Sequence, residues 1–210
     1  MSPSPDSPPP SRAPLEPPLE VEPKPWTERV LRAFKEEIGG LNFRLILAHV
    51  VMHLLPSHHF PRLRTTIYRL AGFRIGPRSL IFGRMEFTGS TALQRQLSIG
   101  ADTMVNVNCF IDLNAQIHIG DRAAIGHHVT FVTADHDLGS ASCRAGVMRP
   151  KPIIIEDGCW IGANSMILPG VRLGHGSIVS AGSVVSGSVP PDRMVGGVPA
   201  RPLKTLSSGP

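Results

Sequence analysis

The sequence has 210 residues and a formal net charge of +5, with 41% hydrophobic and only 5% aromatic residues. Glycine and proline each occur 21 times, which suits short strands joined by tight turns better than a helical protein. The odd count of three cysteines argues against a disulfide framework, and no run of eighteen apolar residues could form a membrane-spanning helix.

Residues 1–25 contain ten prolines and carry a net charge of −2, whereas residues 26–210 carry +7. Because proline removes a backbone donor and fixes φ, we expect a disordered leader here, with a proline-rich ligand for a partner domain as the alternative. The leader lacks the basic and apolar regions of a signal peptide, so a cytoplasmic location is expected. The basic remainder could attract nucleic acid, an anionic membrane or a phosphate-rich small molecule, and charge alone does not choose among them.

Residues 26–74 read as a helical lead-in with three helix candidates. "WTERVLRAFKEEIGG" (26–40) is amphipathic, "LNFRLILAHVVMHLL" (41–55) is apolar on most faces, and "PRLRTTIYRLAG" (61–72) begins with a proline, as helices often do. The second candidate is too short to cross a bilayer, so the lead-in is expected either to cap the main domain or to lie on a membrane surface. The polar side of the third helix is expected to present Arg62, Arg64 and Arg69.

A six-residue repeat fills most of the remaining chain. From residue 155 an aliphatic side chain recurs at every sixth position, and a small residue follows each of them by four. The aliphatic series is Ile155, Ile161, Ile167, Leu173, Val179 and Val185. Earlier series cover residues 99–117 and 119–131, and a weaker one starts at Ile75.

A period of six fits neither a helix nor an ordinary amphipathic strand, because it requires a short strand and a turn in every six residues. Three such sides close a triangular coil of eighteen residues, and successive coils stack as parallel strands about 4.8 Å apart. The aliphatic residue points inward beside the small one, and Cys109 and Cys159 are expected in this packed interior. The sequence therefore predicts a mainly β protein, a parallel β-helix of about five coils over residues 75–203, followed by a tail at 204–210.

The repeat stops just after His136 and resumes near residue 152, so residues 137–151 are predicted to form a loop. The blocks around this loop resemble the left-handed β-helix, hexapeptide-repeat acyltransferases, in particular the sugar O-acetyltransferase branch with the galactoside, maltose and polysaccharide acetyltransferases. The matching blocks are "NVNCFID", "IHIGD", "TADH", "KPIIIEDGCWIGANSMILPGV", "AGSVV" and "GGVPAR", between residues 99 and 201. The lead-in "LLPSHHFPRLRTTIYRLAGFRIG" is similar to that of the polysaccharide-cluster members.

The resemblance implies a left-handed β-helix and a homotrimer in which the loop walls an active site between neighbouring subunits. It implies direct acetyl transfer from acetyl-CoA, the co-substrate, to a sugar hydroxyl, with His136 as the catalytic base. Histidine suits this role because its ordinary pKa lies near neutrality. The acceptor is expected to be a polysaccharide or glycan precursor, with no nucleic-acid partner and with peripheral contact at the inner membrane face.

The resemblance also assigns binding positions. Asn106 is expected to contact the acceptor, with a turn role as the alternative, and Asp112 either belongs to the acceptor site or caps a turn. A backbone N–H at Gly162–Ala163 is expected to hold the developing oxyanion. The positions assigned to acetyl-CoA are Trp160, Gly162, Ala163, Ala181, Ser186 and Arg201.

Several alternatives stay open. The family's acidic acceptor contact has no equivalent in residues 26–74, which leaves the identity of the acceptor open. Streptogramin and chloramphenicol acetyltransferases share the fold and the histidine, so an antibiotic acceptor is one alternative, and an amino group on a nucleotide sugar is another. A non-catalytic β-helix scaffold is a further alternative. A zinc enzyme of the carbonic anhydrase kind would need three converging histidines, which the spacing does not indicate, so no metal site is expected.

Overall fold

The structure is a computed structural model that describes residues 26–28, 30–31, 42–56, 58–89 and 93–207. The chain divides into two compact units, residues 1–40 and 41–210. In the first unit the described residues are helical, within the helix predicted at 26–40, and the predicted leader lies outside the described residues. The second unit contains all the strands of the described chain.

Two helices begin this unit where the sequence predicted them. Helix α2 spans Phe43–Leu54, and the side chain of its N-cap Asn42 accepts the N–H of Leu45 at 3.2 Å. Helix α3 spans Pro61–Leu70 with proline in its first turn. No helix in the described part of the chain is long and apolar enough to cross a membrane.

Arg64 corrects the prediction made for α3. It was expected on the polar side of the helix, but only 2% of it is exposed. Its guanidinium turns inward and donates to the carbonyl oxygens of Leu55 (3.1 Å), Pro56 (2.7 Å) and His59 (3.0 Å). These carbonyls belong to the connection between α2 and α3, whose backbone acceptors need partners when they are buried. Helical periodicity places a side chain on a face but does not reveal such tertiary acceptors.

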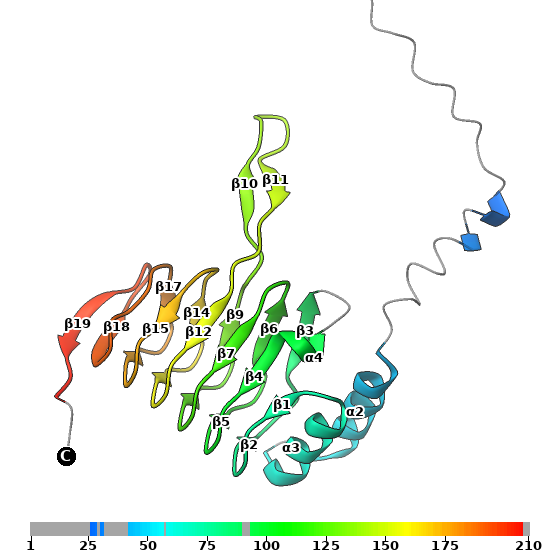
Figure 1. Ribbon diagram of the computed structural model, residues 1–210, viewed down its shortest axis with the longest axis horizontal. Helices are drawn as coiled ribbons and strands as arrows, with labels where there is room; N and C mark the ends of the chain where they lie inside the picture. Colours follow the sequence, from blue (N-terminus) through cyan, green and yellow to red (C-terminus); the bar gives the residue numbers. More distant parts are fainter. Residues whose placement is uncertain (1–25, 29, 32–41, 57, 90–92, 208–210) are drawn as a thin grey trace, which may run out of the picture. The chain divides into compact units, whose positions relative to one another are not determined.

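The rest of the unit is a parallel β-helix (Figure 1). Sheet A consists of β1 (Arg74–Ile75), β4 (Leu97–Ile99), β7 (Ile117–Ile119), β12 (Ile153–Ile155) and β15 (Arg172–Leu173). Sheet B consists of β2 (Leu80–Ile81), β5 (Met104–Val105), β8 (Ala124–Ile125), β13 (Trp160–Ile161), β16 (Ile178–Val179) and β18 (Arg193–Gly196), with β19 (Arg201–Thr205) antiparallel at its edge. Sheet C consists of β3 (Glu86–Gly89), β6 (Phe110–Leu113), β9 (Thr130–Phe131), β14 (Met166–Ile167) and β17 (Val184–Val185), and α4 (Leu93–Gln96) precedes β4.

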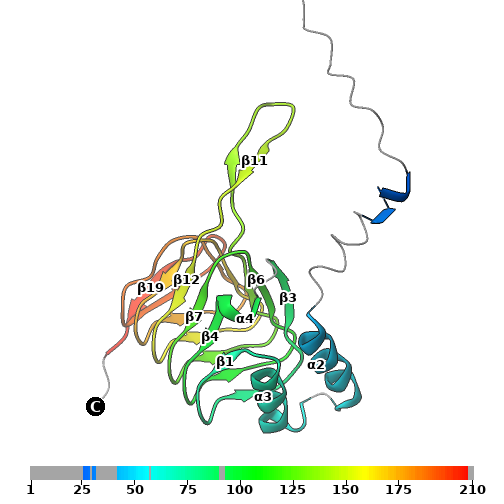
Figure 2. The same cartoon turned by 45° about the vertical axis from the view of Figure 1, so that its right-hand side comes forward.

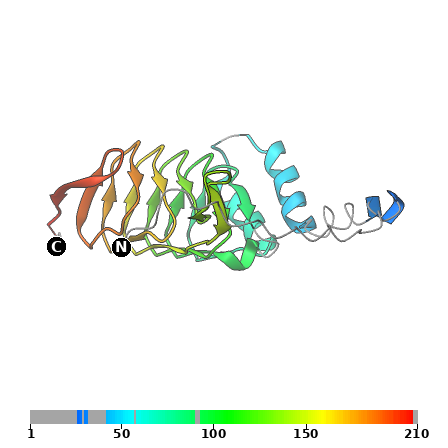
Figure 3. The ribbon, with the colours of Figure 1, turned by 90° about the horizontal axis from the view of Figure 1, so that it is seen from above.

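The chain visits sheets A, B and C in turn, and the five circuits confirm the predicted number of coils (Figure 3). Ile155 pairs with Leu173, and Ile167 pairs with Val185, each eighteen residues further on. The aliphatic residues of the repeat are buried, and so are the small residues that follow them, including Cys109 and Cys159. The interior is therefore a continuous column of aliphatic and small side chains, as the repeat predicted.

Every insertion in the repeat falls at one corner of the triangle. In sheet C, successive partners Phe87, Ile111, Phe131, Ile167 and Val185 are separated by 24, 20, 36 and 18 residues. The extra residues lie between sheet C and the next strand of sheet A, a position that we call corner CA. The corners between sheets A and B (corner AB) and between sheets B and C (corner BC) keep short turns in these coils.

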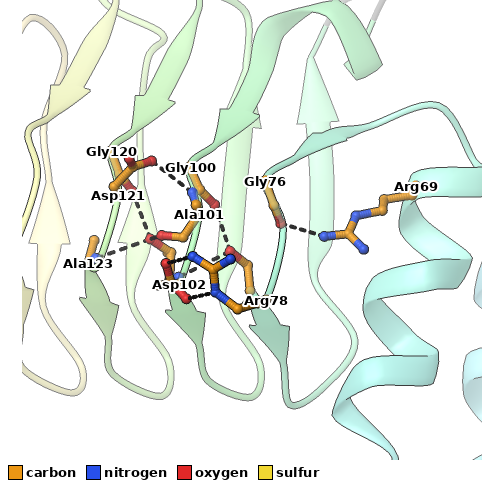
Figure 4. Close-up of polar contacts among 11 residues, drawn as sticks. Arg69, Gly76, Arg78, Gly100, Ala101, Asp102, Gly120, Asp121 and Ala123 are labelled. Atoms are coloured by element: carbon orange, nitrogen blue, oxygen red, sulfur yellow. Dashed lines mark hydrogen bonds and ion pairs between the residues drawn. The ribbon is translucent and has the colours of Figure 1, made fainter.

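Corner AB is closed by its own side chains (Figure 4). Arg78 donates two hydrogen bonds to Asp102, at 2.6 and 2.5 Å, one coil further on. Asp121 accepts the N–H of Ala101 at 2.8 Å, and Asp157 accepts that of Asp121 at 2.9 Å. These hydrogen bonds link the polar groups of one coil to those of the next, so corner AB has a structural role.

The largest insertion at corner CA forms an antiparallel hairpin that projects from the stack (Figure 2). Its strands are β10 (His136–Leu138) and β11 (Ala145–Met148), so the hairpin begins one residue before the loop predicted at 137–151. Asp112, on β6, holds the chain where it leaves the stack. One of its carboxylate oxygens accepts the N–H groups of Thr133 (3.0 Å) and Ala134 (2.7 Å), and only 3% of the residue is exposed.

An aromatic cluster joins α2 and α3 to the first coil. His49 stacks on Phe87 with ring centroids 6.1 Å apart and lies edge-on to Tyr68. Its Nε2 is buried and has no hydrogen-bond partner among the described residues. Burial lowers the pKa of His49 below its ordinary value, and the positive charges of Arg84 and His53 lower it further.

This lowered pKa predicts a loss of stability in acid. The unfolded chain binds a proton at His49 near the ordinary pKa of 6.5, whereas the folded chain resists it, so the free energy of unfolding falls as the pH drops below about 6.5. His49→Phe keeps an aromatic ring in the cluster and removes the titration. The decrease in urea midpoint from pH 7.5 to pH 5.5 is expected to be smaller in this variant than in wild type. The exposed His175→Gln variant is the control and should behave as wild type; equal decreases in all three proteins would contradict the prediction.

Asp112→Asn is predicted to destabilise the protein by about 1–3 kcal/mol, because an amide cannot accept all the hydrogen bonds that the buried carboxylate accepts. Urea unfolding at pH 7.5 measures this cost. The matched control is Asp137→Asn, which breaks an exposed ion pair with Arg149 and should change stability by less than about 1 kcal/mol. Equal effects of the two substitutions would contradict the role assigned to Asp112.

Candidate active site

His136 stands at the base of the hairpin with its side chain exposed. Its Nδ1 lies 3.0 Å from the carbonyl oxygen of Gly146, on the opposite strand. A carbonyl oxygen can only accept, so Nδ1 carries the hydrogen and the neutral ring presents Nε2 as a proton acceptor. The hairpin thus fixes the tautomer that a general base requires.

The residues around His136 fix its position. Asp135 accepts the backbone N–H of His136 at 2.9 Å and forms an ion pair with Lys151 at 2.7 Å. The hydrogen bond from Lys151 and that from His136 N–H together lower the pKa of Asp135. The Asp135–Lys151 ion pair links the two segments that flank the hairpin, next to His136; because it is exposed, it contributes little to stability.

Ala163 and Ala181 lie on corner BC in successive coils, and Asn106 lies on the same corner two coils before Ala163, with Gly126 in the coil between them. The N–H groups of Gly126 and Gly162 donate to carbonyls of the next coil, at 2.8 and 2.7 Å, and these positions stack directly. A Cβ at Gly126 would lie 2.6 Å from the nitrogen of Ala163, and one at Gly162 would lie 2.4 Å from that of Ala181. Only glycine permits this approach, so corner BC is smooth from Ala163 to Ala181, whereas His127 and His128 are exposed on the same corner one coil before Ala163.

Two further residues that were predicted to bind acetyl-CoA lie together at the C-terminal end of the stack. Ser186 and Arg201 line one cavity of about 340 Å³. Arg193 lines this cavity too. The sequence did not indicate this, because Arg193 lies on β18 and reaches the cavity only through the pairing of β18 with β19. Trp160 lies elsewhere, on sheet B between Ala124 and Ile178, with 56% of its surface exposed.

Within one chain the predicted residues divide between two edges of the stack. His136 and Asp112 belong to corner CA, whereas Asn106, Ala163 and Ala181 belong to corner BC. A triangular coil keeps its corners apart, so a single chain does not bring His136 to Ala163. The carboxylate of Asp112 is occupied by backbone N–H groups, which agrees with the turn-capping alternative; its part in an acceptor site stays a prediction.

The described ranges hold no group of three or more His, Cys, Asp and Glu side chains placed to bind a metal. Of the three free cysteines, Cys109 and Cys159 are buried in the interior of the coils, as predicted. Burial raises the pKa of the Cys109 thiol to about 11 and also raises that of Cys159. Both are therefore packing residues rather than nucleophiles.

Comparison with known proteins agrees with this architecture. A family model described as the hexapeptide repeat of succinyl-transferase matches residues 152–186. The crystal structure of a hexapeptide-repeat-containing acetyltransferase from Vibrio cholerae is 34% identical, with a TM-score of 0.68, over 82% of this chain and 94% of that one. The same protein is also known in complex with acetyl coenzyme A.

Among curated proteins, nodulation protein L of Rhizobium meliloti is 45% identical over 105 residues, which are 50% of this chain and 57% of that protein. The galactoside O-acetyltransferase of Escherichia coli is 32% identical over 111 residues, 53% of this chain and 55% of that protein. The chain thus spans about half the length of the curated relatives that it matches. The Vibrio cholerae structure, by contrast, is covered almost completely at 34% identity, and this chain therefore belongs to the hexapeptide-repeat acetyltransferases.

Proposed function

We propose that this protein transfers the acetyl group of acetyl-CoA directly to a hydroxyl of a sugar, with His136 as general base. The observation that carries the proposal is the exposed ring of His136, held by Gly146 so that Nε2 can accept a proton. The acetyl coenzyme A complex of the Vibrio cholerae relative and the name of the Escherichia coli relative support the donor and the reaction type. The proposed acceptor is a polysaccharide or glycan precursor.

The chain offers a group for each step of this reaction. Nε2 of His136 removes the proton of the acceptor hydroxyl while its oxygen attacks the thioester carbonyl carbon. The N–H of Gly162 is already donated to the carbonyl of Val179, so we assign the oxyanion contact to the N–H of Ala163. When the tetrahedral intermediate collapses, the C–S bond breaks, the acetyl ester forms, and the proton on His136 passes to the leaving thiolate.

Corner BC suits a long, extended acetyl donor such as acetyl-CoA, because it continues as a smooth edge from Ala163 to Ala181. In this proposal the pantetheine arm lies along that edge, and Trp160 borders it. The phosphate-bearing end reaches the cavity lined by Ser186, Arg193 and Arg201, where the guanidinium groups can donate to phosphate oxygens.

The separation of the corners supports a homotrimer in which each active site takes His136 from one chain and corner BC from its neighbour. The hairpin is suited to such a contact, since Leu138 and Val147 expose apolar side chains on it.

A second part of the proposal is that the enzyme works at the cytoplasmic membrane face. It is supported by exposed apolar residues of α2, among them Phe43, Leu47, Val50 and Leu54.

His136→Ala is predicted to lower kcat for thiol release from acetyl-CoA by about 10²- to 10⁴-fold, because no other group takes the acceptor proton. A panel of sugars and glycan intermediates serves as acceptors, and coenzyme A binding should not change. His175→Ala, at corner AB, is the control. Equal release by wild type and His136→Ala would remove His136 from the mechanism. Release only with antibiotic acceptors would favour that alternative, and coenzyme A binding without any turnover would favour a scaffold.

A shared site predicts complementation between two inactive variants. His136→Ala lacks the base, and Ala163→Trp fills corner BC. Mixed trimers, purified with two different affinity tags, should regain activity, since one of their interfaces pairs an intact hairpin with an intact corner. Trimers of either variant alone are the controls, and mixed trimers as inactive as these controls would argue against a site built from two chains.

A further inference from the structure

A second cavity, of about 250 Å³, lies where the connection from α2 to α3 meets the first coils. The residues that matter here are His53, His58, Arg64, Arg84, Val107 and Asn108, and we call it the basic cavity. It is separate from the cavity lined by Ser186 and Arg201, which lies at the other end of the stack. The proposed mechanism of acetyl transfer uses none of these side chains.

The basic cavity lies in line with corner BC. Val107 and Asn108 belong to the same turn as Asn106, the predicted acceptor contact. Gly83, which also lines the cavity, stacks on Val107, since a Cβ at Gly83 would lie 2.8 Å from the Cα of Val107. Along this edge Ala181 and Ala163 come first, then the exposed His127 and His128 of the adjacent coil, then Asn106, and the basic cavity follows. A ligand that reaches beyond Asn106 therefore enters it.

Arg64 brings a buried positive charge that lacks a carboxylate partner. Among the described residues its guanidinium donates to the three carbonyls named above and to the sulfur of Met52 at 3.3 Å. Within the described ranges no acidic side chain forms an ion pair with it. A buried charge is costly unless an opposite charge offsets it, so an anion in the cavity would lower the electrostatic energy of the site.

Arg84 adds a second guanidinium. One of its nitrogens pairs with Glu86 at 2.6 Å, and another lies 2.6 Å from Nε2 of His53. An arginine can only donate, so His53 accepts through Nε2 and retains the hydrogen on Nδ1 as a donor. Two guanidinium groups against one carboxylate leave the cavity with net positive charge, and the imidazoles and Asn108 add further hydrogen-bond donors. Such a set matches the oxygens of a phosphate ester or a carboxylate.

We propose that the basic cavity binds the anionic substituent of the acceptor, so that the acceptor is an acidic sugar. The hydroxyl to be acetylated lies at Asn106, and the phosphate ester or carboxylate of the same molecule enters the basic cavity. This inference rests on the proposed function and specifies its acceptor class.

The kinetic test compares glucose, glucose 1-phosphate and glucuronate as acceptors for thiol release from acetyl-CoA by the full-length protein. At least one charged sugar should have a kcat/KM well above that of glucose. Comparing glucose 1-phosphate with glucuronate then shows whether the cavity prefers a phosphate ester or a carboxylate. Arg84→Gln should raise KM for that sugar about tenfold or more without changing kcat/KM for glucose. Arg78→Gln removes the same charge at corner AB and should alter neither. Equal use of all three sugars, or an equal effect of Arg84→Gln on all of them, would overturn the proposal.

A binding measurement keeps this inference separate from the proposed function. Glucose 1-phosphate and glucuronate are titrated calorimetrically into the protein saturated with coenzyme A. The bound coenzyme A fills the site proposed for the phosphates of acetyl-CoA, so the sugars cannot bind there. Wild type should bind a charged sugar and Arg84→Gln should bind it at least tenfold more weakly, whether or not any sugar is acetylated. His53→Asn, which keeps Arg84, should also weaken binding and guards against misfolding of the first variant. Failure of wild type to bind either sugar would overturn the inference even if acetyl transfer to neutral sugars is observed.

Discussion

The stacking of each short strand on its counterpart in the next coil is the constraint on which the rest of this structure depends. Strands of two or three residues are too short to be stable alone. They persist because those inside the stack pair on both sides and bury a hydrophobic side chain in a common column. A shift of register by one residue would turn Ile161 or Ile167 outward, so the period of six is enforced at every step. The result is a rigid prism whose edges are fixed in space.

The three edges of this prism have different uses. Corner AB is tied together by side chains such as Arg78, Asp102 and Asp121, which leaves it structural. Corner CA accepts all the insertions, because a turn that points away from the stack can lengthen without disturbing the pairing of the strands. Corner BC stacks closely at Gly126 and Gly162 and is smooth from Ala163 to Ala181, with His127 and His128 exposed one coil before. A rigid scaffold with one projecting hairpin and one smooth edge can hold a base and an extended donor in fixed positions.

The same geometry explains why a site of this kind would be assembled from two chains. His136 stands on one edge and Ala163 on another, and no side-chain rotation within one prism brings the two edges together. Assembly of prisms side by side can do so without any change in the fold. The cap of α2 and α3 lies at the N-terminal end of corner BC, where Arg64 of α3 and Arg84 of the first coil line the basic cavity.

The sequence by itself determined the parts that obey a local period. The alternation of Ile155, Ile161 and Ile167 with small residues was sufficient to predict the β-helix and its number of coils, and the break after His136 predicted the projecting segment. Motif resemblance added the family. Only the tertiary structure decided that Arg64 turns inward, that Arg193 joins Ser186 and Arg201, and that the predicted residues divide between two corners. Those features depend on contacts between residues far apart in the chain, or on backbone carbonyls that become acceptors only once a connection is folded, and neither leaves a periodic trace in the sequence.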